Sequence, residues 1–230
     1  SGSIDQAISS YSKDDPDYYM HVQKIIEDHA IEASICKVAC SESLAYIVDE
    51  GVQVLGGAGF IEEYDMACIY RDERINRIFE GTNEVNRLII SGYTLKKSIL
   101  EELPIRDLIA SIPDNWYQDI QCENKFVKRE ADVIEFSRSC IAYFINELIN
   151  IYGQDLKNDQ WVVEPLANCI ISFCIMDTGF KKYKNIDSDT NHGQEVARVL
   201  KLSVYDQYLS MLSNIKTISL YIDTNFSKAT

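Results

Sequence analysis

Apolar residues recur at steps of three and four through the first quarter of the chain, the spacing of one helix face. Asp15 and Pro16 suit a helix start, with Asp as the N-cap and Pro at the first helical position. The apolar stripe consists of Val22, Ile25, Ile26, His29, Ala33, Cys36, Cys40, Leu44, Ile47 and Val48. The next glycine is Gly51, and the pair Gly56-Gly57 suits a C-cap and turn. The pattern predicts one long helix that ends at this pair.

Glycines divide the following stretch into two shorter helices. One helix is predicted from about Tyr64 to Phe79, and Gly81 separates it from another that continues to about Leu100. Thr82 directly follows the glycine and is a suitable N-cap for the second of these helices.

The pattern changes again at LPIRDLIASIPDNW, from Leu103 to Trp116, which carries two prolines and is the best candidate for a domain boundary. Beyond it, apolar stripes predict helices over about Asp119–Tyr152, Gln160–Tyr183 and Gln194–Asp223. We therefore expect an all-α chain, with one helical domain over residues 4–103 and an appended up-down bundle over residues 104–230.

Composition supports this fold class and restricts the partners. The 230 residues are 46% hydrophobic and contain few helix breakers, with Gly 10 and Pro 4. The formal net charge of -14 at pH 7 argues against DNA or RNA, because phosphate binding depends on clustered Lys and Arg. Anionic membrane surfaces are disfavoured for the same reason. No stretch approaches the roughly 20 apolar residues of a membrane span, so no integral membrane segment is predicted.

The seven cysteines indicate a reducing compartment. Their number is odd, and they fall mostly within apolar helical patterns without a repeated pair spacing. Cys36 and Cys40 share a helix face, but no histidine cluster completes a ligand set. We expect no metal and interpret this pair as small buried side chains. His21, His29 and His192 have no Ser or Cys partner at a recognisable spacing, and no catalysis is assigned to them.

Glu80 stands directly before Gly81, at the break between two predicted helices. Spacing alone would favour a solvated residue at a helix end. The nearby Arg71, Arg74 and Arg77 lie among acidic residues, so we interpret them as partners in ion pairs within the helix or between subunits rather than as a phosphate-binding patch.

Two longer motifs change the interpretation of Glu80. GVQVLGGAGF at residues 51–60 and YRDERINRIFEGTNEVNRLII at residues 70–90 resemble the last helices of the acyl-CoA dehydrogenase family. In that family a glycine-rich turn, an Arg-Asp helix and an EGTNE break come in this order and spacing. The resemblance extends from about His21 to Leu100. The bundle after Pro104 resembles, in architecture alone, the appended domain of the very-long-chain branch.

The resemblance implies that Glu80 is the catalytic base. It would remove the α-proton of an acyl-CoA while the β-hydrogen leaves as a hydride to the flavin of FAD. The backbone N–H of Glu80, with a ribityl hydroxyl of the flavin, is implied to hold the thioester carbonyl as in an oxyanion hole. We expect a carboxylate beside Ile78 and Phe79 that faces a flavin and an acyl chain to be desolvated, which raises its pKa toward the range of a general base.

Four further residues are implied to contact FAD. Gln53 and Gly57 match positions that reach the adenosine half of a neighbouring subunit's FAD, where a missing side chain lets the backbone approach a ligand. A plain helix end is the alternative for both. Thr82 and Glu84 match positions near the adenine and ribose of FAD, at the positive end of a helix. Capping alone would also explain Thr82.

For the whole protein, the resemblance implies an FAD-dependent oxidoreductase that dehydrogenates long straight-chain acyl-CoA in fatty acid β-oxidation. It further implies electron-transfer flavoprotein as acceptor, a homo-oligomer, and the bacterial cytoplasm or the mitochondrial matrix. Ser1-Gly2-Ser3 resembles a cloning scar, and we expect a C-terminal fragment that lacks most of the flavin cradle and is inactive alone. The alternative is a helical scaffold, derived from this family, that assembles other proteins. The intact FEGT motif favours the enzyme.

Overall fold

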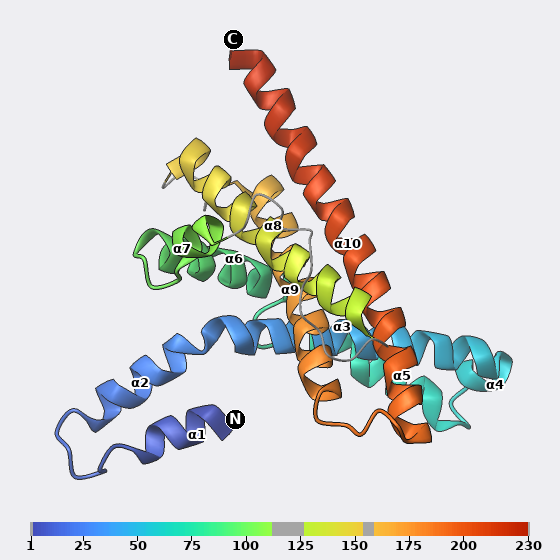
Figure 1. Ribbon diagram of the computed structural model, residues 1–230. Helices are drawn as coiled ribbons and strands as arrows, with labels where there is room; N and C mark the ends of the chain where they lie inside the picture. The colour runs from blue at the N-terminus through green and yellow to red at the C-terminus, as the bar shows by residue number, and fades with distance from the viewer. Residues whose placement is uncertain (1, 112–126, 154–158, 230) are drawn as a thin grey trace. The chain divides into compact units, whose positions relative to one another are not determined.

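The computed structural model consists of helices joined by turns over the residues that it describes, which are 2–111, 127–153 and 159–229 (Figure 1). Side chains are described as far as residue 222. No strand occurs in these ranges, so the all-α prediction is confirmed. The chain forms two compact units, residues 1–93 and 94–230. This division precedes the boundary predicted near Pro104, and the assignment of domains to 4–103 and 104–230 stays a prediction.

The first unit centres on one long helix. In chain order, its elements are α1 (Gly2–Ser9), α2 (Tyr18–Asp28), α3 (Ala30–Leu55), α4 (Gly57–Phe60), α5 (Asp65–Arg74), the 3₁₀ helix η1 (Ile75–Arg77) and the first part of α6 (Asn83–Ile99). α3 contacts α2, α4, α5 and η1. Figure 1 shows the chain running from α2 along α3 to α4 at the other end of α3.

The single long helix predicted before Gly56 is wrong in one respect, because it is broken at His29. His29 leaves helical geometry, with φ of -101° and ψ of 11°, and separates α2 from α3. Its backbone N–H bonds to Ile26 O at 3.1 Å, a 3₁₀-type contact. Its ring Nδ1 lies 2.8 Å from the Ile25 carbonyl oxygen, which an unbroken helix would bond to the His29 backbone N–H.

The buried face of α3 is not the predicted apolar stripe. The residues that α3 buries are Ser34, Ile35, Val38, Ser41 and Val48. Of the predicted stripe, Val48 is buried, but Ile47 is 64% exposed and Leu44 is 40% exposed. The reason is that α3 packs a partly polar face against the rest of the unit, where polar side chains bind to it. Most of its apolar stripe is therefore left uncovered.

The glycine pair ends α3 as predicted. Gly56 is the C-cap, with φ of 59° and ψ of -136°, a conformation open almost only to glycine. Gly59 has a different reason to be glycine, since a Cβ there would approach Val52 O to 2.8 Å. After this turn, the helix predicted from Tyr64 to Phe79 is shorter, because α5 ends at Arg74 and tightens into η1.

The second unit contains the rest of α6, then α7 (Ile105–Ala110), α8 (Lys128–Tyr152), α9 (Gln160–Tyr183) and α10 (Asn191–Ala229). The three long helices pack on one another. Their apolar core consists of Val127, Ala131, Ile134, Met176, Phe180, Tyr183, Ala197, Leu200 and Val204. The three helices predicted for this region are therefore present, although the predicted start at Asp119 lies outside the described residues.

Contrary to the expectation that no stretch approaches a membrane span, α9 is long and apolar enough to cross a membrane, by length and composition. However, 56% of its apolar window is buried inside the protein, and core helices of soluble proteins meet the same criterion. No other helix in the described ranges does so. We therefore describe α9 as a core helix of the second unit.

The cysteines differ between the units. Cys36, Cys40 and Cys68 are exposed, so the interpretation of Cys36 and Cys40 as buried side chains is wrong for this chain, because they lie on the uncovered face of α3. In the second unit, burial raises the pKa of the Cys140 thiol to about 11 and that of Cys169 to about 12. Among the described residues, no group of three or more His, Cys, Asp and Glu side chains could hold a metal ion.

Candidate active site

Glu80 lies in a short bend between η1 and α6. Its backbone φ is 54° and that of Gly81 is 82°, so two successive residues occupy the left-handed region. Glycine adopts this conformation freely, whereas a residue with a Cβ is strained there by about 1–2 kcal/mol. Such strain clusters at functional sites and persists only where the surroundings hold it in place. The contacts that hold the bend are therefore part of the site.

Glu80 itself is exposed. Within the described residues, neither its backbone N–H nor its carboxylate makes a hydrogen bond. The neighbouring Ile78 and Phe79 are 48% and 45% exposed. The residues that the structure describes do not supply the desolvated surroundings expected for Glu80, because both apolar neighbours are about half exposed. The free N–H and the free carboxylate are, however, both available to a ligand.

The carbonyl of Gly81 is held from two sides. The ammonium of Lys37, on α3, donates to Gly81 O at 2.8 Å, and the side-chain amide of Asn86, on α6, donates to the same oxygen at 2.9 Å. Asn86 also donates to Thr82 O at 3.0 Å. Lys37 makes a second bond, at 2.6 Å, to Asn83 Oδ1. The bend is thus tied to α3 and to α6 at once.

Asn83 is the buried centre of a polar network between these two helices. Its Nδ2 donates to Ser41 Oγ at 3.0 Å and to Glu42 Oε1 at 3.1 Å. Because Lys37 can only donate and the Glu42 carboxylate can only accept, these two partners fix the orientation of the Asn83 amide. Glu42 also binds both terminal nitrogens of Arg87, each at 2.8 Å, a strong two-point pair.

Sequence reasoning did not find this network. Its members share one signal, which is a group of polar residues close together on each of two helices. They are Lys37, Ser41 and Glu42 on α3, and Asn83, Asn86 and Arg87 on α6. Lys37 and Ser41 are four residues apart, with Glu42 directly after Ser41, and Asn83 precedes Asn86 and Arg87 by three and four residues, so each set occupies neighbouring positions on its helix surface. That the two sides meet is a tertiary fact with no local signal.

Thr82 is the N-cap of α6, as predicted. Its hydroxyl accepts a hydrogen bond from the Val85 N–H at 3.3 Å. The pKa of the Glu84 carboxyl is lowered, first by a hydrogen bond from its own backbone N–H and then by one from the Thr82 hydroxyl, with smaller contributions from the charges of Arg87 and Lys37. Thr82 and Glu84 therefore lie with Glu80 at one helix start, and their contacts with FAD stay a prediction.

Gln53 and Gly57 lie elsewhere, at the end of α3. Gln53 is twelve residues beyond Ser41 on this helix, which corresponds to about 18 Å along its axis. Its exposed side chain makes no hydrogen bond within the described residues. A Cβ on Gly57 would meet open space, so no contact within the described part of the chain requires glycine there. The structure thus separates this pair from the Glu80 bend.

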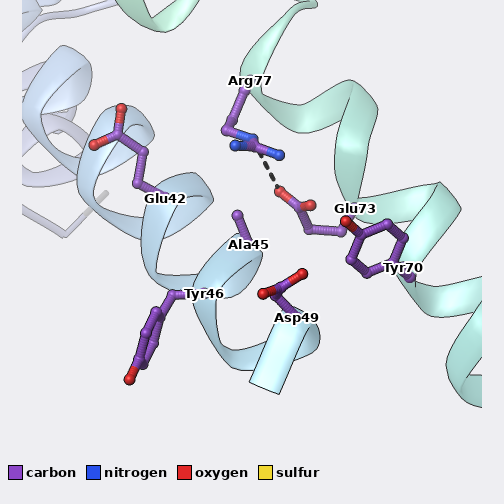
Figure 2. Close-up of a pocket in the computed structure, with 7 residues that line it drawn as sticks. All are labelled: Glu42, Ala45, Tyr46, Asp49, Tyr70, Glu73 and Arg77. Carbon is purple, nitrogen blue, oxygen red and sulfur yellow. Dashed lines mark ion pairs between the residues drawn. The ribbon is translucent and has the colours of Figure 1, made fainter. Parts of the chain in front are cut away.

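A pocket of ≈ 340 Å³ adjoins the network, between α3 and α5 with η1 (Figure 2). It is lined by Glu42, Ala45, Tyr46, Asp49, Tyr70, Glu73 and Arg77. Figure 2 shows Arg77 facing the buried Glu73, with which it forms an ion pair at 3.4 Å. Three carboxylates against one guanidinium make this pocket unsuitable for a phosphate group.

The prediction of ion pairs within the helical segment is confirmed for Arg77, whereas Arg71 pairs with a residue of the turn before α5. Arg77 pairs with Glu73, and Arg71 pairs with Glu62 at 3.2 Å. Arg74 forms no ion pair among the described residues. Because the Arg71 pair is exposed, it contributes little to stability.

Comparison with known proteins gives a consistent picture. Residues 6–93 match the family profile described as acyl-CoA dehydrogenase, C-terminal domain. A probable acyl-CoA dehydrogenase of Bacillus subtilis is 31% identical over 214 residues, which cover 90% of this chain and 35% of that relative. An alignment of this length includes residues of both units. The human mitochondrial short-chain specific acyl-CoA dehydrogenase is 43% identical over 65 residues, which cover 28% of this chain and 16% of that enzyme.

A solved structure resembles nearly the whole chain. It is an acyl-CoA dehydrogenase from Bacillus anthracis, crystallised in complex with FAD, and it matches with a TM-score of 0.84 and 26% sequence identity. The match covers 96% of this chain and 38% of that protein. This chain therefore spans about a third of the length of its long relatives.

Proposed function

We propose that this chain supplies the catalytic base of an FAD-dependent acyl-CoA dehydrogenase, because residues 6–93 match the profile of the C-terminal domain of that family. The observation that carries the proposal is the bend at Glu80. A strained residue with a free N–H and a free carboxylate is presented at a helix start by a network of side chains. The proposed activity is that of a whole protein comparable to the relatives, of whose length this chain spans about a third.

The reaction divides between two groups of Glu80. Its carboxylate takes the proton from the α-carbon of the acyl thioester, while the β-hydrogen leaves with its electron pair and a double bond forms between the two carbons. Its backbone N–H donates to the thioester carbonyl, which stabilises the enolate-like charge that develops as the α-proton leaves. FAD, when bound, supplies the acceptor for the β-hydrogen.

Four residues of this chain are suited to contact the adenosine part of FAD. Gly57 offers open backbone and Gln53 an unbonded side-chain amide, so a ligand can approach both without disturbing the fold. Thr82 and Glu84 stand at the N-terminal end of α6, where the helix dipole favours electron-rich groups. We assign Gln53 and Gly57 to a neighbouring subunit's FAD and the other two residues to the FAD beside Glu80.

Finer features of the function are part of the same proposal. The substrate would be a long straight-chain acyl-CoA of β-oxidation and the acceptor electron-transfer flavoprotein, in a homo-oligomer of the bacterial cytoplasm or mitochondrial matrix. The intact FEGT motif supports the straight-chain assignment, and the B. subtilis relative, which aligns over both units, supports a long form with an appended domain like that of the very-long-chain branch. We expect no turnover from this chain alone, because it does not enclose Glu80.

The test uses the full-length protein, purified with its flavin. We expect acyl-CoA to bleach the flavin absorbance under anaerobic conditions. Glu80→Gln should keep FAD bound but lose at least about 100-fold in the rate of bleaching, the usual contribution of a positioned general base. Glu63→Gln, which removes an exposed carboxylate without partners in the described residues, is the matched control.

Two outcomes would overturn the proposal. Near-normal bleaching by Glu80→Gln would remove Glu80 as the base. A full-length protein that binds no flavin would favour the alternative, a helical scaffold derived from this family.

A further inference from the structure

The strained bend at Glu80 must be held against its tendency to relax. On one side, Ile78 and Phe79 are anchored by hydrogen bonds from their N–H groups to Ile75 O, at 2.9 and 3.0 Å. On the other side the anchor is the Gly81 carbonyl, whose two lone pairs are both used, one by Lys37 and one by Asn86. Asn86 belongs to α6, the helix that the bend itself starts, so it cannot fix the bend relative to α3. Lys37 lies on α3, so its bond can fix the bend relative to that helix.

Lys37 uses its ammonium in an unusual way. In the described part of the chain it forms no ion pair, and both of its hydrogen bonds go to neutral acceptors, Gly81 O and Asn83 Oδ1. Charge-assisted bonds of this kind are about twice as strong as neutral ones. These two bonds tie Lys37 to the bend and to the start of α6, beyond what a solvated surface lysine would do.

The packing of α3 on α6 has other supports. The Glu42–Arg87 pair and the bonds of Asn83 to Ser41 and Glu42 connect the two helices without Lys37. Lys37 is the member of the network on α3 that bonds to the bend itself. Its loss should therefore loosen the bend more than it loosens the contact between the helices.

We propose that Lys37 is a positioning residue for Glu80: its ammonium, shared between Gly81 O and Asn83 Oδ1, holds the left-handed bend and so aims both the carboxylate and the N–H of Glu80 at the substrate. This inference rests on the proposed function of Glu80. It concerns a residue that touches neither substrate nor cofactor and acts through the backbone.

The test compares Lys37→Met with the wild type in the full-length flavin-loaded protein. We expect turnover per bound FAD to fall about 10- to 100-fold, because a small misplacement of a catalytic group is that costly. The exchange of the substrate's α-hydrogen with solvent deuterium should slow in parallel, since it reports the proton transfer to Glu80 alone. KM should change little, and Lys37→Arg, which retains the charge and several donors, should recover part of the loss.

Two further variants keep the result decisive. Lys24→Met removes an exposed lysine of α2 that has no partner in the described residues, and it should leave turnover and exchange unchanged. Should Lys37→Met fail to fold, Lys37→Gln decides, because it keeps a neutral donor and should fold with an intermediate loss of turnover.

The outcomes separate this inference from the proposed function. If Glu80→Gln abolishes α-hydrogen exchange while Lys37→Met or Lys37→Gln, with FAD bound, exchanges at the wild-type rate, Lys37 is not a positioning residue and the proposed function stands. If Glu80→Gln exchanges normally, the proposed function fails first. The inference would also be rejected if turnover in the Lys37 variants fell only in proportion to the FAD they lose. The same holds if Lys37→Arg recovered none of the lost turnover.

Discussion

At the scale of single residues, the Thr82 hydroxyl stabilises the start of α6. Thr82 Oγ accepts a hydrogen bond from the Val85 N–H, so it satisfies an otherwise unpaired helix donor, and Glu84, whose carboxyl pKa is lowered, places a charge at the positive end of the same helix. Thr82 and Glu84 both lie within four residues of Glu80. The residue that caps the helix is therefore also a neighbour of the proposed base.

We expect Thr82→Ala to weaken the first turn of α6 by about 1 kcal/mol, the usual cost of losing an N-cap side chain. Amide hydrogen exchange of a peptide containing Val85 should accelerate by roughly fivefold, the factor that corresponds to this free energy. Thr82→Ser retains the hydroxyl and should exchange at nearly the wild-type rate. Equal protection in Thr82→Ala would show that the first turn is held by Asn83 and Asn86 without the cap.

At the scale of elements, the end of α3 places two adjacent glycines in different roles. Gly56 needs its missing Cβ for a backbone conformation, whereas Gly57 has ordinary backbone and open space around the position of a Cβ. Nothing in the described chain explains Gly57. A ligand from outside the chain would, which agrees with the proposal, taken from the family resemblance, that Gly57 contacts FAD.

Two alanine variants separate these roles in the full-length protein. Gly56→Ala should lower stability by about 1–3 kcal/mol, because its φ and ψ are open almost only to glycine. Gly57→Ala should leave the melting temperature unchanged but raise the dissociation constant of FAD by roughly tenfold, since an added methyl in a packed contact costs about 1–3 kcal/mol. Unchanged FAD affinity in Gly57→Ala would remove this residue from the proposed FAD site.

At the scale of the whole molecule, the chain exposes many large apolar side chains of its first unit. Tyr19 and Val54 are each 83% exposed, and Phe60 is 79% exposed. Leu44 and Ile47, on the uncovered stripe of α3, are exposed as well. Soluble monomers seldom expose contiguous apolar patches beyond a few hundred Å². These side chains are therefore available to bury against another protein surface.

We expect this 230-residue chain to self-associate, as a symmetric dimer, at micromolar concentration and ordinary salt. The net charge of -14 opposes association only weakly, because charges are screened within about 8 Å at physiological salt. Sedimentation should show a mass that rises with concentration, and Ile47→Lys should weaken this rise more than Ser43→Lys, an equal charge change at an exposed polar site on α3. A clean monomer at all concentrations would contradict the expectation.

Local rules allowed the sequence to predict some features on its own. The double glycine that ends α3, the Thr82 cap, the bounds of α9 and the all-α class each depend on a few adjacent residues or on one periodicity, and the structure confirms them. The tertiary structure decided the rest. The polar rather than apolar face that α3 buries and the hold of Lys37 on the bend at Glu80 depend on partners distant in the chain, whereas the break at His29 involves local contacts that the apolar stripe did not reveal. An apolar stripe reveals that a helix has something to bury, but which face is buried depends on the surfaces it meets.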